Sequence, residues 1–141
     1  MNRVAEWLAK KFEGYRLKPY RCPAGILTGG WGHAFRKGEK VRDLPEPEAT
    51  EILHQDLSAA AISAFRQCPR LLLESEKRQG AIIDFTFNLG GGRLQASTLR
   101  RRINQGNWEE AARELRKWVY AAGRKLPGLV LRREAEAKLL I

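Results

Sequence analysis

Apolar residues recur at helical spacing over most of this chain. Val4, Leu8 and Phe12 lie four residues apart, so residues 3–12 are predicted to form a short amphipathic helix, which Gly14 ends. A second helix opens near Pro45 and Pro47, because proline suits a first helical turn, and Pro69 ends it. Its expected buried stripe contains Ala49, Ile52, Leu53, Ala60, Ala61, Ala64 and Phe65.

The C-terminal half continues the helical pattern. A third helix is predicted from about Ser75 to Asn88, and it is apolar nearly all round after Gly80, which is typical of a central buried helix. Three more helices follow: 97–104 with Ser97 as N-cap, 107–120 with Asn107 as a weaker N-cap, and a last one that carries Leu131, Ala135 and Leu139.

Residues 15–36 break this pattern, with β-branched and aromatic residues between glycines, and they predict a hairpin or a three-stranded sheet. Four of the 13 glycines crowd this stretch, where the backbone must turn tightly or approach a ligand. The expected fold is α+β and mostly α, in a single domain over residues 1–141. A small sheet region spans about 13–45, and a helical lobe of about 47–141 packs with helix 3–12.

Composition narrows the function classes. A net charge of +10 favours a polyanionic partner, which could be nucleic acid, anionic lipid or an acidic cell-wall polymer. No nucleic-acid-binding motif appears, so we expect no nucleic-acid partner. Cys22 and Cys68 fit neither a metal site nor a disulfide framework, so no metal is expected. The first ten residues contain the charged Arg3, Glu6 and Lys10 and so do not form a long apolar run. We therefore expect no signal peptide, no signal-anchor and no stable membrane insertion.

Glu13 is the candidate for acid chemistry. A glycosidic bond breaks when a carboxylic acid protonates the leaving oxygen while a second group handles water or the sugar cation. Cys22 follows Glu13 by nine residues and Thr28 follows Cys22 by six, beside the glycine-rich stretch. By position alone, Glu13 is more typical of an exposed residue at a helix end.

The ordered motifs resemble those of phage-type lysozymes, the endolysins of glycoside hydrolase family 24, in their lambdoid branch. The family pattern is Glu, eight residues, Asp or Cys, five residues, Thr, and then Gly-x-Gly-His. The chain has Glu13, Cys22, Thr28 and Gly30-Trp31-Gly32-His33 at those spacings. Further blocks follow in family order over nearly the full chain, at 54–56, 85–90, 97–99, 108–112 and 128–133.

The resemblance implies a lysozyme-like fold with a cleft between the sheet region and the helical lobe. It implies a muramidase that needs no cofactor and hydrolyses the β-1,4 bond between N-acetylmuramic acid and N-acetylglucosamine in peptidoglycan, for host-cell lysis. Glu13 matches the general acid, and Thr28 matches the residue that positions water. Cys22, an Asp in many members, matches the residue that stabilises charge or activates water. The matched substrate-binding positions are Gly32, Phe87, Asn88 and Thr98.

Several roles stay open at this stage. Cys22 is either a base or nucleophile, or a small apolar filler beside Glu13. Asn88 either bonds to nearby backbone or faces a sugar N-acetyl group. Either Arg132 or Arg133 could reach back towards Glu13. Trp7, Trp31, Trp108 and Trp118 are predicted to be mainly core residues, and Trp31 has sugar stacking as its alternative.

Asp56 lies inside the buried stripe of the second helix, where a carboxylate needs a partner. His33 ends the glycine loop, so we expect a His33–Asp56 ion pair that ties the sheet region to that helix. This pair is expected to be structural, because no third ligand is spaced for zinc.

Other functions compete with a hydrolase. A lytic transglycosylase would use the same glutamate as acid and then base and would leave 1,6-anhydro ends. A non-catalytic wall-binding module would not need Glu13, and a nucleic-acid-binding protein would show salt-sensitive binding. For the hydrolase, we expect a monomer in the host bacterial cytoplasm before lysis. It would act on periplasmic peptidoglycan with the help of a holin-type membrane permeabiliser.

Overall fold

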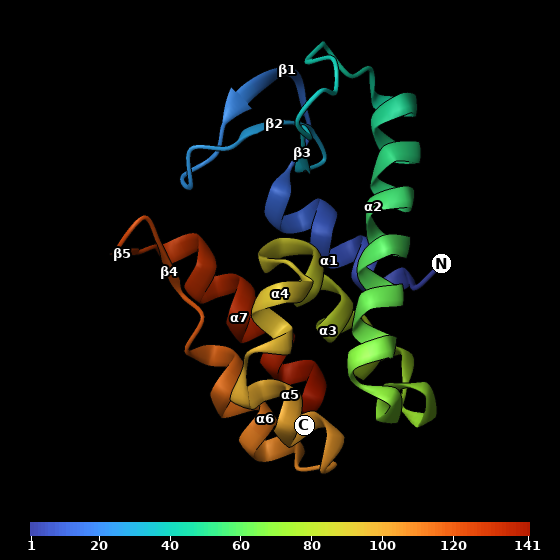
Figure 1. Cartoon of the computed structure of the whole chain (residues 1–141), viewed down its shortest axis with the longest axis vertical. Coiled ribbons are helices and arrows are strands. Elements are labelled where there is room, and N and C mark those ends of the chain that lie inside the picture. Colours follow the sequence, from blue (N-terminus) through green and yellow to red (C-terminus); the bar gives the residue numbers. More distant parts are fainter.

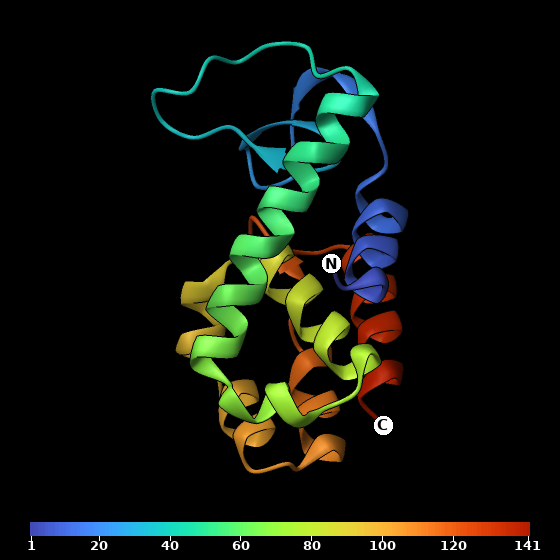
Figure 2. The ribbon, with the colours of Figure 1, turned by 90° about the vertical axis from the view of Figure 1, so that its right-hand side faces the viewer.

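The computed structural model describes all 141 residues and has a small sheet region above a helical lobe (Figure 1). The long helix α2 (Glu46–Gln67) runs along one side of both (Figure 2). Helix α1 (Arg3–Glu13) leads from the lobe into the sheet region. The fold is thus α+β and mostly helical, as the sequence pattern predicts.

The sheet region is built from three antiparallel strands in the order β1-β2-β3. Tyr20 of β1 pairs with Thr28 of β2, and the register shifts nearer the start of β1. Gly30 and Gly32 have φ angles of 59° and 73°, which a residue with a side chain rarely adopts, so they allow the tight turn into β3. The strand bounds are Arg16–Arg21, Leu27–Gly30 and His33–Ala34.

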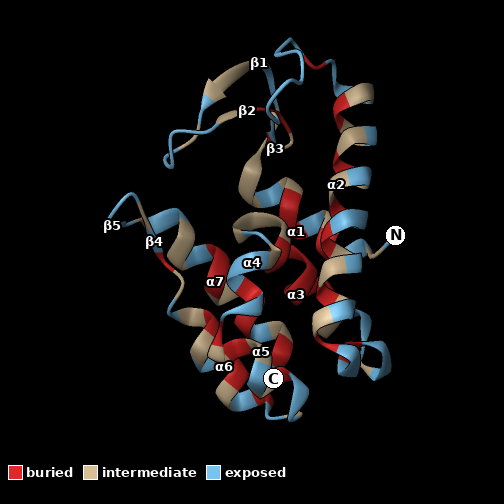
Figure 3. Cartoon of the chain, viewed as in Figure 1, coloured by how far each residue is buried: buried red, intermediate tan, exposed pale blue.

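Helix α3 (Glu76–Leu89) is the centre of the helical lobe, and it is continuously buried from Gly80 to Thr86 (Figure 3). A Cβ at Gly80 would lie 2.6 Å from the Cβ of Val4, so only glycine lets α1 and α3 approach this closely. The elements around it are a 3₁₀ helix (Pro69–Leu73), α4 (Gly91–Gln95), α5 (Thr98–Asn104), α6 (Trp108–Arg116) and α7 (Pro127–Leu140).

The apolar core has a large cluster inside the helical lobe and a smaller one where α1, α2 and α3 meet. The stripe of α2 differs in part from the prediction, because Leu57 is buried while Ile52 is only half-buried. Trp7 is a further correction, since 56% of its surface is exposed. Ala5, Leu8 and Ala9 occupy the buried face of α1 instead.

Helix α6 ends at Arg116, earlier than the predicted end near residue 120. The chain then forms a two-stranded hairpin of β4 (Tyr120–Ala121) and β5 (Arg124–Lys125), which turns through Ala122 and Gly123 at positive φ. Pro127 opens α7.

Charged residues occupy the buried face of α7, which corrects the prediction based on Leu131, Ala135 and Leu139. Leu131 is 65% exposed. The buried residues are Arg132, Arg133, Glu136, Ala137 and Leu140. A buried charge must be paired, so this face points to an ionic cluster inside the lobe.

The two cysteines are free thiols in different environments. Cys68 is fully buried, and burial raises the pKa of its thiol to about 11. Cys22 is only half-buried. None of the helices combines the length and the apolar character needed to cross a membrane.

Candidate active site

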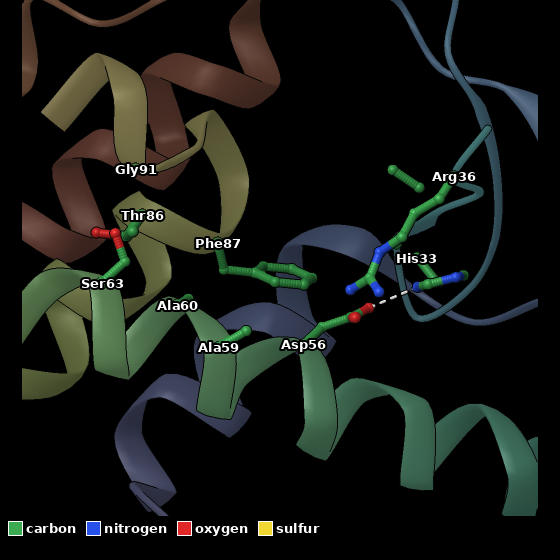
Figure 4. Close-up of a pocket in the computed structure, with 11 residues that line it drawn as sticks. His33, Arg36, Asp56, Ala59, Ala60, Ser63, Thr86, Phe87 and Gly91 are labelled. Atoms are coloured by element: carbon green, nitrogen blue, oxygen red, sulfur yellow. Dashed lines mark hydrogen bonds and ion pairs between the residues drawn. The ribbon is translucent and has the colours of Figure 1, made fainter. Parts of the chain in front are cut away.

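A cavity of about 380 Å³, here called the interlobe cavity, opens between the sheet region and the helical lobe (Figure 4). Gly32, His33 and Arg36 border it on the sheet side, whereas α2 and α3 supply the opposite wall, with Phe87 projecting into the middle. This cavity is the cleft that the sequence predicts between the two regions.

Glu13 lies at the end of α1, where the helical lobe meets the sheet region. Its side chain is 17% exposed, and its Oε2 accepts a hydrogen bond from Nη1 of Arg132 at 2.5 Å. A Cβ at Gly32 would lie 2.5 Å from Cδ of Glu13, so glycine is required there by the approach of the carboxyl group. Because Gly32 also lines the cavity, the Glu13 carboxyl group lies directly beside the cavity wall.

Tyr20, Cys22 and Thr28 share one face of the β1–β2 hairpin. Tyr20 and Thr28 are cross-strand partners, and Cys22 follows Tyr20 by two residues in a ladder that the Cys22 N–H extends to the Ile26 carbonyl. Burial raises the pKa of the Tyr20 phenol, and the negative charge of Glu13 raises it further. The hairpin face that carries Cys22 and Thr28 is therefore close to Glu13.

The Thr28 side chain is almost fully buried, and its hydroxyl donates to the Ile26 carbonyl at 2.9 Å. The hydroxyl oxygen keeps its lone pairs, with which it can accept a hydrogen bond from water. Cys22 begins the tight turn of the hairpin, where its carbonyl accepts from the Gly25 N–H at 2.8 Å. Both residues are thus fixed by backbone contacts.

A buried carboxylate of α3 orients the arginine that binds Glu13. Asp84 accepts from Arg132 Nε at 2.9 Å and from Nη2 at 2.7 Å, in a bidentate pair. Burial alone would raise the pKa of Asp84, but the Arg132 guanidinium holds it below its ordinary value. Nη1 of Arg132 is therefore left to donate to Glu13. Asp84 is not among the predicted site residues, although a carboxylate in a helix that is apolar nearly all round is a signal of a buried partner.

Arg133 and Glu136 extend this ionic cluster. Arg133 Nη2 donates to Asn88 Oδ1 at 2.9 Å and to Glu136 Oε2 at 3.0 Å. Burial and the neighbouring Asp84 raise the pKa of Glu136 well above its ordinary value, so a proton stays within the cluster. The amide oxygen of Asn88 thus contacts a side chain of α7 and not nearby backbone.

The predicted His33–Asp56 pair is present in the structure, with Nδ1 of His33 2.7 Å from Oδ2 of Asp56. The hydrogen bond with Asp56 raises the pKa of His33 against the effect of burial. Glu39, which the sequence analysis did not single out, occupies the other ring nitrogen at 2.9 Å. The pair joins β3 to α2 across one end of the cavity.

Of the other predicted residues, some line the cavity and others lie away from it. Phe87 lines the cavity. Thr98 begins α5, accepts from Arg101 at 3.2 Å, and lies outside the cavity lining. Trp31 is half-buried and donates to the Thr50 hydroxyl at 3.3 Å, which anchors it against α2.

Comparisons with known proteins agree with this architecture. A family model described as phage lysozyme matches residues 10–136. A SAR-endolysin of Bacteriophage PS119 is 38% identical over 126 residues, which cover 88% of this chain and 73% of that protein. An endolysin of Acyrthosiphon pisum secondary endosymbiont phage 1 is 34% identical over 137 residues, covering 94% and 91%. The solved muramidase domain of SpmX from Asticaccaulis excentricus superimposes with a TM-score of 0.80 at 28% identity, covering 99% and 95%.

Proposed function

The chain belongs to the phage lysozyme family, and we propose that Glu13 is the general acid of its muramidase reaction. The protein is a glycoside hydrolase of the endolysin type that cleaves the β-1,4 bond between N-acetylmuramic acid and N-acetylglucosamine in peptidoglycan. The observation that carries the assignment of Glu13 is its place beside the interlobe cavity, between Arg132 and Gly32.

The reaction adds water across the bond. Glu13 gives its proton to the glycosidic oxygen, which leaves with N-acetylglucosamine as a hydroxyl group. Water attacks the anomeric carbon of N-acetylmuramic acid, which becomes a hydrated reducing end. Thr28 orients this water through its oxygen lone pairs, and Cys22 on the same hairpin face accepts the water proton or stabilises the developing positive charge.

Arg132 supports this acid by fixing its position. When Glu13 carries its proton, Arg132 keeps its bidentate partner Asp84 and does not become a free buried cation. When Glu13 has given its proton away, Arg132 offers the resulting carboxylate a charge-assisted hydrogen bond. The same side chain thus serves both protonation states without moving.

Mass spectrometry of purified peptidoglycan tests the assignment directly. The wild-type protein should release fragments with hydrated reducing ends on N-acetylmuramic acid, and Glu13→Gln should release none. Glu51→Gln is the matched control, because Glu51 is an exposed glutamate of α2 outside the cavity. This control should cleave as fast as the wild type.

Two other outcomes would overturn the proposal in different ways. Fragments with 1,6-anhydro ends would assign a lytic transglycosylase. Binding to the wall without any glycan cleavage would make the protein a wall-binding module in which Glu13 is dispensable.

The state of the protein and its route to the wall are separate parts of the proposal. We expect a monomer in solution, which sedimentation equilibrium would show as a 16.0 kDa species. We also expect expressed protein to lyse host cells only with a holin-type permeabiliser, so lysis without that protein would contradict the expected dependence.

A further inference from the structure

Arg36 stands beside the interlobe cavity with a guanidinium that has no partner in the protein. It follows β3, it is exposed, and it lines the cavity beside His33 (Figure 4). Its backbone N–H donates to Glu39 Oε1 at 2.9 Å, so the main chain is fixed while the side chain extends over Asp56.

The two carboxylates nearest to Arg36 are already engaged. Asp56 binds Nδ1 of His33 at 2.7 Å, and both oxygens of Glu39 face Nε2 of His33 at 2.9 and 3.1 Å. His33 thus binds both carboxylates, and neither of them forms a hydrogen bond or an ion pair with the Arg36 guanidinium. The five N–H donors of the Arg36 guanidinium are therefore left for a ligand.

The rest of the cavity is suited to a ligand with an amide and an apolar part. Ser63 lies seven residues beyond Asp56 on α2, which places it about 10 Å further along the helix axis. Its oxygen accepts from Gln67 Nε2 at 3.0 Å, so its own hydroxyl hydrogen is free to donate. Phe87 forms an apolar wall between the two ends.

We propose that Arg36 binds a carboxylate of the peptide stem attached to the glycan, so that the enzyme prefers strands that carry stems. This inference rests on the proposed function. The hydroxyl and acetamido groups of a glycan are uncharged, whereas stem peptides carry carboxylates, and a planar guanidinium binds a carboxylate through two parallel hydrogen bonds. Arg36 is then a specificity residue at the end of the cleft bordered by β3 and α2.

The test compares two soluble substrates, one with peptide stems and one without them. One is a set of un-cross-linked glycan strands with intact stems, and the other is the same strands after an amidase has removed the stems. Arg36→Gln should lower kcat/KM on the first substrate by about tenfold, mainly through KM, because one charge-assisted contact is lost. On the stripped strands it should equal the wild type.

Lys37→Gln is the matched control, because it removes the neighbouring exposed cation, which does not line the cavity. It should leave the ratio of the two substrates unchanged, and an equal loss in this variant would show that only net charge matters. Amidase digestion leaves the lactyl carboxylate on each muramic acid. An Arg36→Gln loss of the same size on stripped strands would therefore overturn the assignment to the stem.

The same assay separates this inference from the proposed function. If Glu13→Gln cleaves both substrates as well as the wild type does, the proposed function fails. If only the wild type and Lys37→Gln cleave normally, while Arg36→Gln loses activity equally on both substrates, the function stands and the role of Arg36 in stem binding fails.

Discussion

Two groups of charged residues in this molecule differ in their exposure to water. The sheet-side cluster contains His33, Glu39 and Asp56, and the Glu39 side chain is 33% exposed. The core cluster contains Glu13, Asp84, Arg132, Arg133 and Glu136, and the Asp84 and Glu136 side chains are 0% exposed. Water can replace a lost partner in the first cluster, whereas each charge in the second depends on its neighbours.

Removing Asp84 should give the largest effect that separates the two clusters. Asp84→Asn removes the fully buried, bidentate counter-charge of the Arg132 guanidinium and leaves only the contact with Glu13, so the free energy of unfolding should fall by about 3–5 kcal/mol. Urea unfolding at pH 7 measures this loss. A loss smaller than that of Asp56→Asn under the same conditions would mean that burial does not distinguish the clusters.

Cys22 lies outside both clusters, so replacing it separates the chemistry from the stability. If Cys22 acts directly, Cys22→Ala should lower the rate of glycan cleavage by about a hundredfold, as the loss of a general base does, while urea unfolding changes little. Cys22→Ser should also be slow. A loss of only a few-fold in both variants would identify Cys22 as a small apolar filler.

Breaking the sheet-side cluster should have a smaller and pH-dependent effect. Because the folded pKa of His33 is raised above its unfolded value near 6.5, the pair stabilises the protein fully below pH 6.5. That contribution is lost as pH rises through the folded pKa. Asp56→Asn should therefore lower the free energy of unfolding by about 1–3 kcal/mol at pH 5, and by less at pH 8.5.

Urea unfolding of Asp56→Asn and the wild type at both pH values measures this difference. Glu39→Gln is the companion variant, and it should show the same trend with a smaller amplitude, since Glu39 is more exposed. A loss that is equal at pH 5 and pH 8.5 would contradict a protonated His33 as the source of the stability.

The smallest effect is expected from an ion pair outside both clusters. Arg42 and Glu48 contact each other, but their side chains are 41% and 43% exposed, so water and salt screen the interaction. Arg42→Gln should leave the midpoint of urea unfolding unchanged. A clear decrease would show that exposed pairs matter here as much as partly buried ones.

The two clusters also differ in how far sequence reasoning could reach them. Asp56 interrupts the apolar stripe of its helix, so the sequence alone indicates that this carboxylate needs a partner. His33 is a natural candidate, because the chain has only two histidines. The core cluster joins residues 13, 84 and 132, which lie on three separate helices. Local spacing carries no signal for such a contact.

The face of α7 was assigned wrongly for a related reason. Leu131, Ala135 and Leu139 have the expected helical spacing, but the buried face lies about one residue further along and contains Arg132 and Glu136. The expectation that Arg132 or Arg133 reaches back towards Glu13 is confirmed for Arg132, but the apolar pattern does not show that this arginine is buried. The carboxylates of α1 and α3 stabilise it in the interior. Tertiary pairing therefore decided which face of the helix is buried.

Within the site, spacing was informative where the residues lie on one local segment. Glu13, Cys22 and Thr28 are predicted from a motif shared with phage-type lysozymes, and such a motif can be read from spacing because the end of α1 and the hairpin follow one another along the chain. Tyr20 was missed, because its proximity to Glu13 depends on the strand register. Arg36 was missed because its role depends on His33 engaging both nearby acids.

The contrast between the two thiols makes the protein suitable for site-selective labelling. Cys68 is sealed in the core with a pKa of about 11, so alkylating reagents at neutral pH do not find a reactive thiolate there. Cys22 is accessible at the hairpin turn. A maleimide-linked fluorophore should therefore attach at Cys22 alone and report, through its emission, when a glycan strand enters the cleft.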